Sequence, residues 1–260
     1  MTIIVIKNVE QSNAITHAGL FHADDVFASV FLERVLGQLR LFRTYVVPKN
    51  VKEDVIVFDI GGGEFDHHQK YGNGMRKNGV KYASFGLLWR KYGRYSLRTI
   101  LEEKYVEKVW RMIDGRVVQP IDAADCGQYP NSDIIPVTTI TSIIRGFNPK
   151  WDEDECYDER FEEACDVARV IFDNALREAI SNAKAEEFVN EAINEFDNEV
   201  AKLQKQKINV KAFMGKNEEE YIILSKRIQE ILEIFRKEEK FYFEEAKVLL
   251  KALIINLVRI

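Results

Sequence analysis

The sequence of 260 residues has few cysteines, no long hydrophobic run and no excess of basic residues. Its three cysteines include no CxxC pair, which argues against a disulfide framework and a zinc site and predicts reduced thiols. The apolar runs are too short to span a bilayer, and the opening MTIIVIKNVE lacks the basic and hydrophobic regions of a signal peptide. A cytoplasmic location without a membrane partner is therefore expected.

The distribution of charge limits the class of partner. The formal net charge is −5, and acidic and basic residues are spread along the chain, so no broad basic surface for duplex nucleic acid is expected. A short single strand or nucleotide, held by metal ions and a few basic residues, is compatible with this charge. The length favours two domains.

Apolar runs alternate with helical patterns over residues 1–150, which predicts an α/β domain with a mostly parallel sheet flanked by helices. Strands are expected at TIIVI, NAITH, LFRTYVV and DVIVFDI, and helices at 24–36, 82–92 and 102–122. Residues 151–260 are expected to be helical, with connector helices over 158–206 and a helical tail over 216–260. The apolar stripes of this tail predict a homodimer.

All four histidines lie in two windows, ITHAGLFHADDVF and FDIGGGEFDHHQ, each just after a predicted strand. The first window contains His17, His22 and Asp24. The second contains Asp59, Asp66, His67 and His68. Asp122 and Asp125 end a predicted helix, where the helix dipole disfavours carboxylates. Because ligands of α/β sheets bind beyond the carboxyl ends of the strands, the two windows are expected to meet there. Imidazoles mixed with carboxylates suit manganese, iron, cobalt or zinc, so the combination predicts a dinuclear metal site.

These segments, together with YASFGLLW, DAADCG and GFNPKWDE, resemble the melanocyte-proliferating-gene (Myg) family. That family is a branch of the DHH phosphoesterase superfamily, which includes RecJ-like exonucleases and manganese-dependent inorganic pyrophosphatases. The resemblance covers residues 14–151 closely and the following helices loosely. It implies a DHH-type domain over 1–150, two divalent ions with Mn²⁺ foremost, and hydrolysis of phosphate esters. The implied activity is a 3′-to-5′ exonuclease on RNA or short oligonucleotides.

The resemblance also implies metal-binding and catalytic roles for the residues of the two windows. Metal ligands are implied at His17, His22, Asp24, Asp59, His67 and Asp125, with Asp122 as the alternative to Asp125. Asp59 would bridge the two ions. Catalytic roles are implied for Asp59, for His68, which would face the phosphate, and for Asp66, which would orient a histidine.

Three basic residues follow the second window, Arg76, Lys77 and Lys81, and they either contact substrate phosphates or form an ordinary solvated loop. The family's glycine-rich C-terminal substrate-binding motif has no counterpart in the sequence, so activity is expected mainly on short oligonucleotides. Two other functions stay open. One is a small-molecule phosphatase or pyrophosphatase, and the other is a non-catalytic metal-binding or helical interaction protein.

Overall fold

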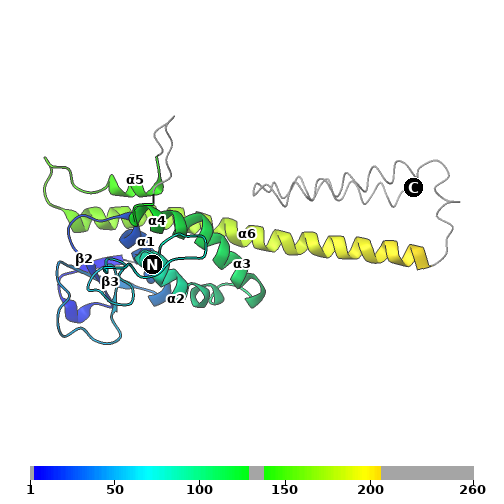
Figure 1. Ribbon diagram of the computed structural model, residues 1–260, viewed down its shortest axis with the longest axis horizontal. Helices are drawn as coiled ribbons and strands as arrows, with labels where there is room; N and C mark the ends of the chain where they lie inside the picture. The colour runs from blue at the N-terminus through cyan, green and yellow to red at the C-terminus, as the bar shows by residue number, and fades with distance from the viewer. Residues whose placement is uncertain (1–2, 129–137, 206–260) are drawn as a thin grey trace. The chain divides into compact units, whose positions relative to one another are not determined.

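The computed structural model describes residues 3–128 and 138–205 (Figure 1). Within them, four parallel strands form a sheet in the order β1-β3-β2-β4. The strands are β1 Ile3–Ile6, β2 Ala14–His17, β3 Leu39–Thr44 and β4 Ile56–Val57. The expected α/β fold with a mostly parallel sheet is confirmed. The last strand is much shorter than the predicted DVIVFDI, because the chain leaves the sheet after Phe58, whose bridge is to Phe65.

The α-helices are α1 Ala23–Leu36, α2 Ser84–Arg98, α3 Glu103–Ile113, α4 Gln119–Asp125, α5 Ile140–Arg145 and α6 Tyr157–Lys205. A 3₁₀ turn, η1, covers Val9–Gln11. The span expected to be helical, 102–122, is helical from Glu103 onward, and it contains a π-helical segment, η2, at Asp114–Val118 between α3 and α4. Such a segment changes the helical phase, so the residues of α4 face a direction that a regular α-helix would not give them.

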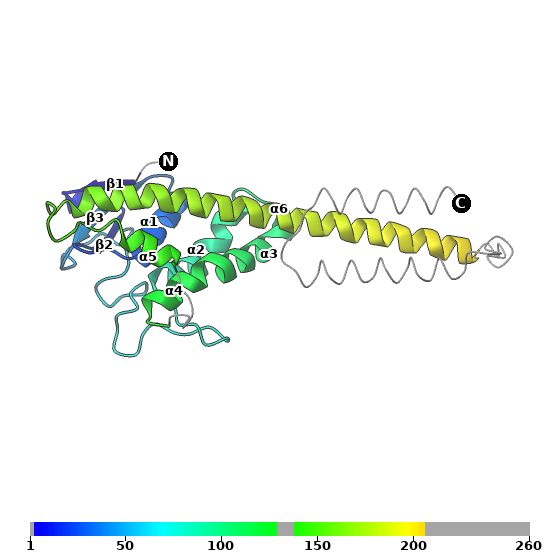
Figure 2. The ribbon, with the colours of Figure 1, turned by 90° about the horizontal axis from the view of Figure 1, so that it is seen from above.

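Figure 2 shows α1 and α2 beside the first half of α6, and aromatic side chains join these helices. Phe31 packs edge-on against Trp89, and Phe172 of α6 contacts both Trp89 and Phe85. All four side chains are almost completely buried. Truncating one such ring to alanine typically costs about 3–5 kcal/mol of folding free energy, so this cluster is a main support of the helical layer.

The chain divides into two compact units, Met1–Ile180 and Ser181–Ile260. The first unit includes the start of α6, because that part of α6 packs on α1 and α2. The predicted tail over 216–260, and the homodimer inferred from it, lie outside the described residues. Among the helices that the structure describes, none is both long and apolar enough to cross a membrane.

Candidate metal centre

The site is built at the carboxyl ends of β2 and β4. His17 is the last residue of β2, and Asp59 follows β4 after one intervening residue. The two strands pair in register, Ile15 with Val57, so their ends lie side by side. Asp59 is buried and has a positive φ of 58°, a region that aspartate tolerates better than most residues. Its N–H donates to the carbonyl of Phe65 at 3.0 Å, which fixes the turn.

The first group of possible metal ligands consists of His17, Asp25 and Asp59. Nε2 of His17 lies 3.2 Å from Oδ2 of Asp25 and 3.3 Å from Oδ2 of Asp59. Both carboxylates are buried, and neither of these two oxygens accepts a hydrogen bond from the described residues. The other Asp25 oxygen accepts the N–H of His22 at the start of α1, at 2.8 Å. Two buried oxygens therefore converge on the His17 ring nitrogen with no other donor among the described residues, an arrangement that a cation would satisfy.

The second group consists of Asp24, His67 and Asp125. Nε2 of His67 lies 2.8 Å from Oδ2 of Asp125, and its Nδ1 lies 4.0 Å from Oδ2 of Asp24. The Asp24 carboxylate accepts the N–H groups of Ser84 and Phe85, at 2.9 and 2.8 Å. These are the first two residues of α2, whose N–H groups and helix dipole favour the ionised carboxylate. Burial and the neighbouring carboxylate of Asp59 act against them and raise the pKa of Asp24 above its usual range.

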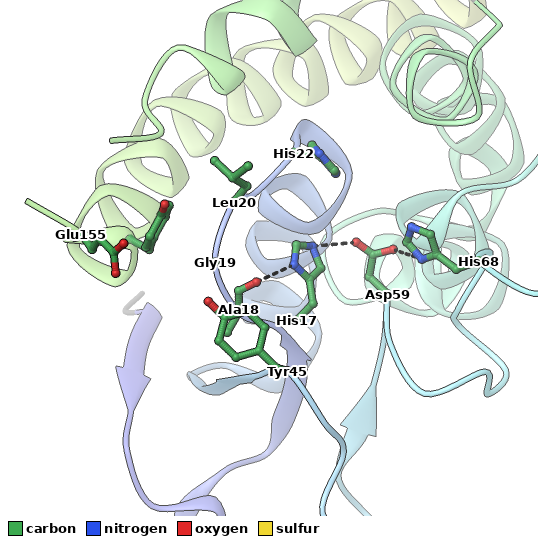
Figure 3. Close-up of a pocket in the computed structure, with 10 residues that line it drawn as sticks. His17, Ala18, Gly19, Leu20, His22, Tyr45, Asp59, His68 and Glu155 are labelled. Carbon is green, nitrogen blue, oxygen red and sulfur yellow. Dashed lines mark hydrogen bonds and ion pairs between the residues drawn. The ribbon is translucent and has the colours of Figure 1, made fainter. Parts of the chain in front are cut away.

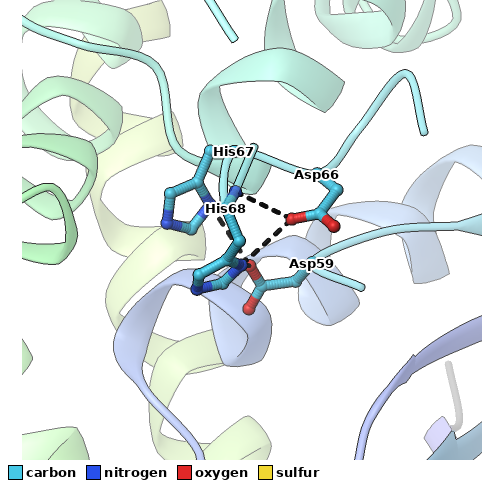
Figure 4. Close-up of side chains that lie close together, drawn as sticks. All are labelled: Asp59, Asp66, His67 and His68. Atoms are coloured by element: carbon cyan, nitrogen blue, oxygen red, sulfur yellow. Dashed lines mark hydrogen bonds and ion pairs between the residues drawn. The ribbon is translucent and has the colours of Figure 1, made fainter. Parts of the chain in front are cut away.

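The third group consists of Asp59, Asp66, His67 and His68 (Figure 4), and it shares Asp59 with the first group and His67 with the second. Nδ1 of His68 lies 3.0 Å from Oδ1 of Asp66, which also accepts the His68 N–H at 2.9 Å. Oδ2 of Asp66 accepts the N–H of Gly62 at 2.7 Å, so the carboxylate is fixed and in turn orients the imidazole. Oδ1 of Asp59 lies 3.2 Å from Nδ1 of His67. The two Asp59 oxygens thus face different groups.

Burial and charge act in opposite directions on the pKa values of this cluster. Burial lowers the pKa of His17, but the carboxylates of Asp25 and Asp59 outweigh it and raise that pKa to about 11. Burial also lowers the pKa of His67, and Asp125 and Asp59 again outweigh it, to about 11. Burial raises the pKa of Asp59, yet both histidines together hold it below its usual range. Protons thus hold the positions that a metal ion would take.

The donor atoms fit divalent transition metals. Within each of the three groups, the candidate atoms lie within 4.8 Å of one another. Imidazole and carboxylate together suit manganese, iron, cobalt and zinc, whereas magnesium and calcium prefer oxygen alone. Asp59 belongs to the first and third groups and His67 to the second and third, so the groups form one continuous cluster. Such a cluster has donors for more than one ion.

Most of the sequence-predicted site residues come together in this cluster. They are His17, Asp24, Asp59, Asp66, His67, His68 and Asp125. His22 belongs to none of the three groups of described residues. Its ring is half-exposed, and its Nδ1 lies 3.6 Å from Oδ1 of Asp125. The first group contains Asp25 and does not contain His22, which the sequence predicted as a ligand. His22 instead caps α1 and lines the neighbouring cavity.

Asp122 and Arg76 form a separate buried ion pair. Nη1 of Arg76 lies 2.7 Å from Oδ2 of Asp122, and its Nη2 lies 2.9 Å from Oδ1 of Asp114. Burial raises the pKa of Asp122 to about 7, although Arg76 acts against it. The Arg76 side chain is only 6% exposed, so the structure places it among carboxylates and not toward a substrate. Lys77 and Lys81 are exposed, and their contact with phosphates stays a prediction.

Sequence reasoning missed Asp25 and Ser84 as members of the site. Asp25 has no predicted role in the site, although two adjacent acids at a helix start next to histidines were the available signal. Ser84 donates its hydroxyl to Oδ1 of Asp59 at 2.9 Å, while its N–H binds Asp24. It therefore connects two acids that come from different segments. Nothing in its immediate sequence, YASFG, marks this role.

An open cavity of about 610 Å³ adjoins the first group (Figure 3). It is lined by His17, Ala18, Gly19, Leu20, His22, Tyr45, Asp59, His68, Glu155 and Tyr157. The imidazole of His68, with 56% of its side chain exposed, reaches this space while Asp66 holds its Nδ1. A substrate can therefore approach the acidic and imidazole groups from the cavity side.

Comparisons with known proteins agree with the resemblance. A MYG1 protein of Saccharomyces cerevisiae is 31% identical over 189 residues, covering 62% of this chain and 55% of the yeast protein. MYG1 proteins of Schizosaccharomyces pombe and Caenorhabditis elegans are 27% and 30% identical, over 68% and 62% of this chain. The chain spans 54 to 62% of the length of these three relatives. No solved structure matches it.

The family model MYG1_exonuc, described as an uncharacterised protein family (UPF0160), matches residues 13–243. The match includes both histidine windows and extends through all of α6. With most of the chain matched and three MYG1 relatives alongside, the chain belongs to the MYG1 family.

Proposed function

We propose that this protein is a metal-dependent phosphoesterase that hydrolyses RNA or short oligonucleotides from the 3′ end through a site for two ions, Mn²⁺ foremost. The observation that carries the proposal is the placement of Asp59. Its two carboxylate oxygens face different ligand groups, Oδ2 toward His17 and Oδ1 toward His67. A carboxylate in that position can bridge two cations, as dinuclear hydrolases require. The name of the matching family, MYG1_exonuc, supports the same reaction class.

The reaction is the addition of water across a phosphoester bond. The water oxygen forms a bond to phosphorus, the bond from phosphorus to the leaving sugar oxygen breaks, and that oxygen takes up a proton. Divalent ions supply activation of the water and neutralisation of negative charge on the phosphoryl oxygens. The protein's own residues hold the ions, orient the phosphate and prevent it from binding in other orientations.

His68 is the side chain best placed to contact the phosphate. Its Nδ1 is bound to Asp66, so Nε2 is the ring nitrogen left for a ligand. The ring lines the cavity beside Asp59. Because the Asp66 carboxylate is itself fixed by the N–H of Gly62, the imidazole is held in one orientation before substrate binds. Such preorganisation is what stabilisation of a developing charge requires.

A direct test uses 5′-labelled RNA of two to ten nucleotides with protein reloaded with Mn²⁺, and pyrophosphate and a cyclic dinucleotide as competing substrate classes. Stepwise loss of mononucleotides from the 3′ end is expected. Asp125→Asn should lose most of this activity, whereas Asp154→Asn, the same change at an exposed residue outside the cluster, should keep it. Preferential hydrolysis of pyrophosphate would favour the small-molecule alternative, and no hydrolysis by the reloaded protein would reject the proposal.

A further inference from the structure

The cavity beside the metal centre has two chemically different ends. Figure 3 shows Asp59 and His68 at one end and Glu155 at the opposite end. Tyr45 and Leu20, with 76% and 60% of their surface exposed, lie between them. One end therefore carries the proposed phosphate chemistry, the middle is aromatic and apolar, and the far end is acidic.

No lysine or arginine belongs to the described residues that line this cavity. The nearest arginine on β3, Arg43, is not free to bind a ligand. Its buried guanidinium donates to the carbonyl of Gly19 at 2.9 Å and pairs with Asp158 at 3.0 Å. The far end of the cavity thus offers no charge that would hold a second phosphate, and the exposed carboxylate of Glu155 would repel one.

The aromatic wall is formed in advance by the loop after β2. The N–H of Ala18 donates to Thr44 at 2.9 Å, and Arg43 holds the carbonyl of Gly19. Gly19 has a φ of 77°, and a Cβ there would lie 3.0 Å from the hydroxyl of Tyr45. Glycine therefore permits both the turn and the close approach of the tyrosine ring. A rigid wall with an exposed ring is the kind of surface on which a nucleobase stacks.

We propose that this cavity binds the 3′-terminal nucleoside of the substrate, with its base on Tyr45 and its sugar hydroxyls donating to Glu155. The inference rests on the proposed function, since it places the 5′-phosphate of that nucleotide at the metal centre. A carboxylate that accepts hydrogen bonds from vicinal ribose hydroxyls is an established mode of recognition. A strand that continued beyond the sugar would bring a phosphate to Glu155, so the same carboxylate selects a free 3′ end.

Binding to the Mn²⁺-loaded full-length chain, measured by isothermal titration calorimetry, tests this without depending on turnover. The probes are adenosine 5′-monophosphate, ribose 5-phosphate and adenosine 3′,5′-bisphosphate. The monophosphate should bind about tenfold more tightly than ribose 5-phosphate, because only it can stack. The bisphosphate should bind about fivefold more weakly than the monophosphate, because its 3′-phosphate meets Glu155.

Substitutions at Tyr45 and Glu155 separate the contributions of the ring and the carboxylate, with Tyr95 as a control. Tyr45→Ala should remove the advantage of the monophosphate over ribose 5-phosphate, and Tyr45→Phe should retain it. Tyr95→Ala, at another exposed tyrosine on α2 outside the cavity, should leave it unchanged. Glu155→Gln should abolish discrimination against the bisphosphate. Equal affinities of Tyr45→Ala and the unmodified protein for the monophosphate would overturn the inference even if RNA is hydrolysed. If the unmodified protein shows the expected binding preferences but does not hydrolyse RNA, the result would count against the proposed reaction alone.

Discussion

At the scale of single residues, the site depends most on Asp59. This residue is buried, has a φ of 58° and directs its two carboxylate oxygens toward different histidines. Residues held in sparsely populated backbone regions persist where the surrounding structure fixes them, and they concentrate at functional sites. Here the fixing contacts are backbone hydrogen bonds of Phe58 to Ile15 and of Asp59 to Phe65, each 3.0 Å long.

Replacing Asp59 with asparagine isolates the contribution of its charge. Asparagine tolerates positive φ as well as aspartate does, so Asp59→Asn should fold normally. Hydrolysis should fall at least about a hundredfold, because the bridging negative charge is lost. The measurement is the rate at which Asp59→Asn hydrolyses a labelled dinucleotide. The control is the rate of Asp54→Asn, which changes an aspartate in the exposed loop before β4. Near-normal turnover of Asp59→Asn would show that this residue does not bridge.

Metal uptake should release protons from His17 and His67. Both have pKa values raised to about 11 by neighbouring carboxylates that outweigh burial, so both are protonated near pH 7 in the metal-free protein. An imidazole must be neutral to bind a metal, so affinity should rise with pH, with about two protons released per loaded site. Calorimetry in two buffers of different ionisation enthalpy counts the protons. An affinity for Mn²⁺ that does not change between pH 6.5 and 8.5 would contradict this assignment.

At the scale of helices and strands, the first turn of α2 places two of the acids, Asp24 of α1 and Asp122 of α4. The N–H groups at the start of α2 bind Asp24, and the N–H of Gly86 donates to Asp122 at 3.0 Å. Asp122 lies one turn before Asp125 on α4 and is held by Arg76. The buried ion pair thus fixes the helix end that carries a candidate metal ligand. Arg76 is a positioning residue in this arrangement.

Gly86 allows this close approach because it has no side chain. A Cβ at Gly86 would lie 2.7 Å from the Asp122 carboxyl carbon and 2.8 Å from Nη2 of Arg76. Gly86→Ala should therefore destabilise the fold by about 1–3 kcal/mol, as overpacking usually does. Gly115→Ala is the matched control, since a Cβ there meets nothing within 4 Å. Urea unfolding gives both values. Equal midpoints for the two variants would show that α2 can shift without cost.

The strand ends could be predicted from the sequence, but the direction of side chains on helices could not. His17 and Asp59 follow apolar strands, and parallel strands bring such positions to one edge. Asp24 and Asp25 are consecutive, yet successive helical residues point about 100° apart, so one faces His67 and the other His17. Which acid faces which histidine depends on how α1 is rotated about its axis.

The choice between Asp122 and Asp125 was open for a related reason. Residues three apart lie on nearly the same face of an α-helix, and the π-helical segment before α4 sets where that face points. The burial of Arg76 depends in turn on Asp114, which is distant in sequence. Only the packed structure shows that Asp122 already has a cationic partner while Asp125 meets His67.

At the scale of the whole molecule, the candidate ligands come from segments far apart in the sequence. His17 ends β2, Asp24 lies in the first turn of α1, Asp59 and His67 flank the turn after β4, and Asp125 ends α4. A metal ion bound by them would connect these segments directly. Since the unfolded chain has no such preformed site, binding free energy becomes folding free energy. The first compact unit, Met1–Ile180, should therefore be more stable with metal than without it.

Thermal unfolding measures this coupling. With free Mn²⁺ at a hundred times its dissociation constant, stabilisation should be about 2.7 kcal/mol for one site. In a unit of this size, that corresponds to an increase in Tm of about 5–10 °C. The increase should disappear with a chelator and should be small in His67→Ala, because His67 belongs to two of the three ligand groups. An equal increase in that variant would mean that the stabilising Mn²⁺ does not bind through His67, and the second and third ligand groups would then lose their role in the metal centre.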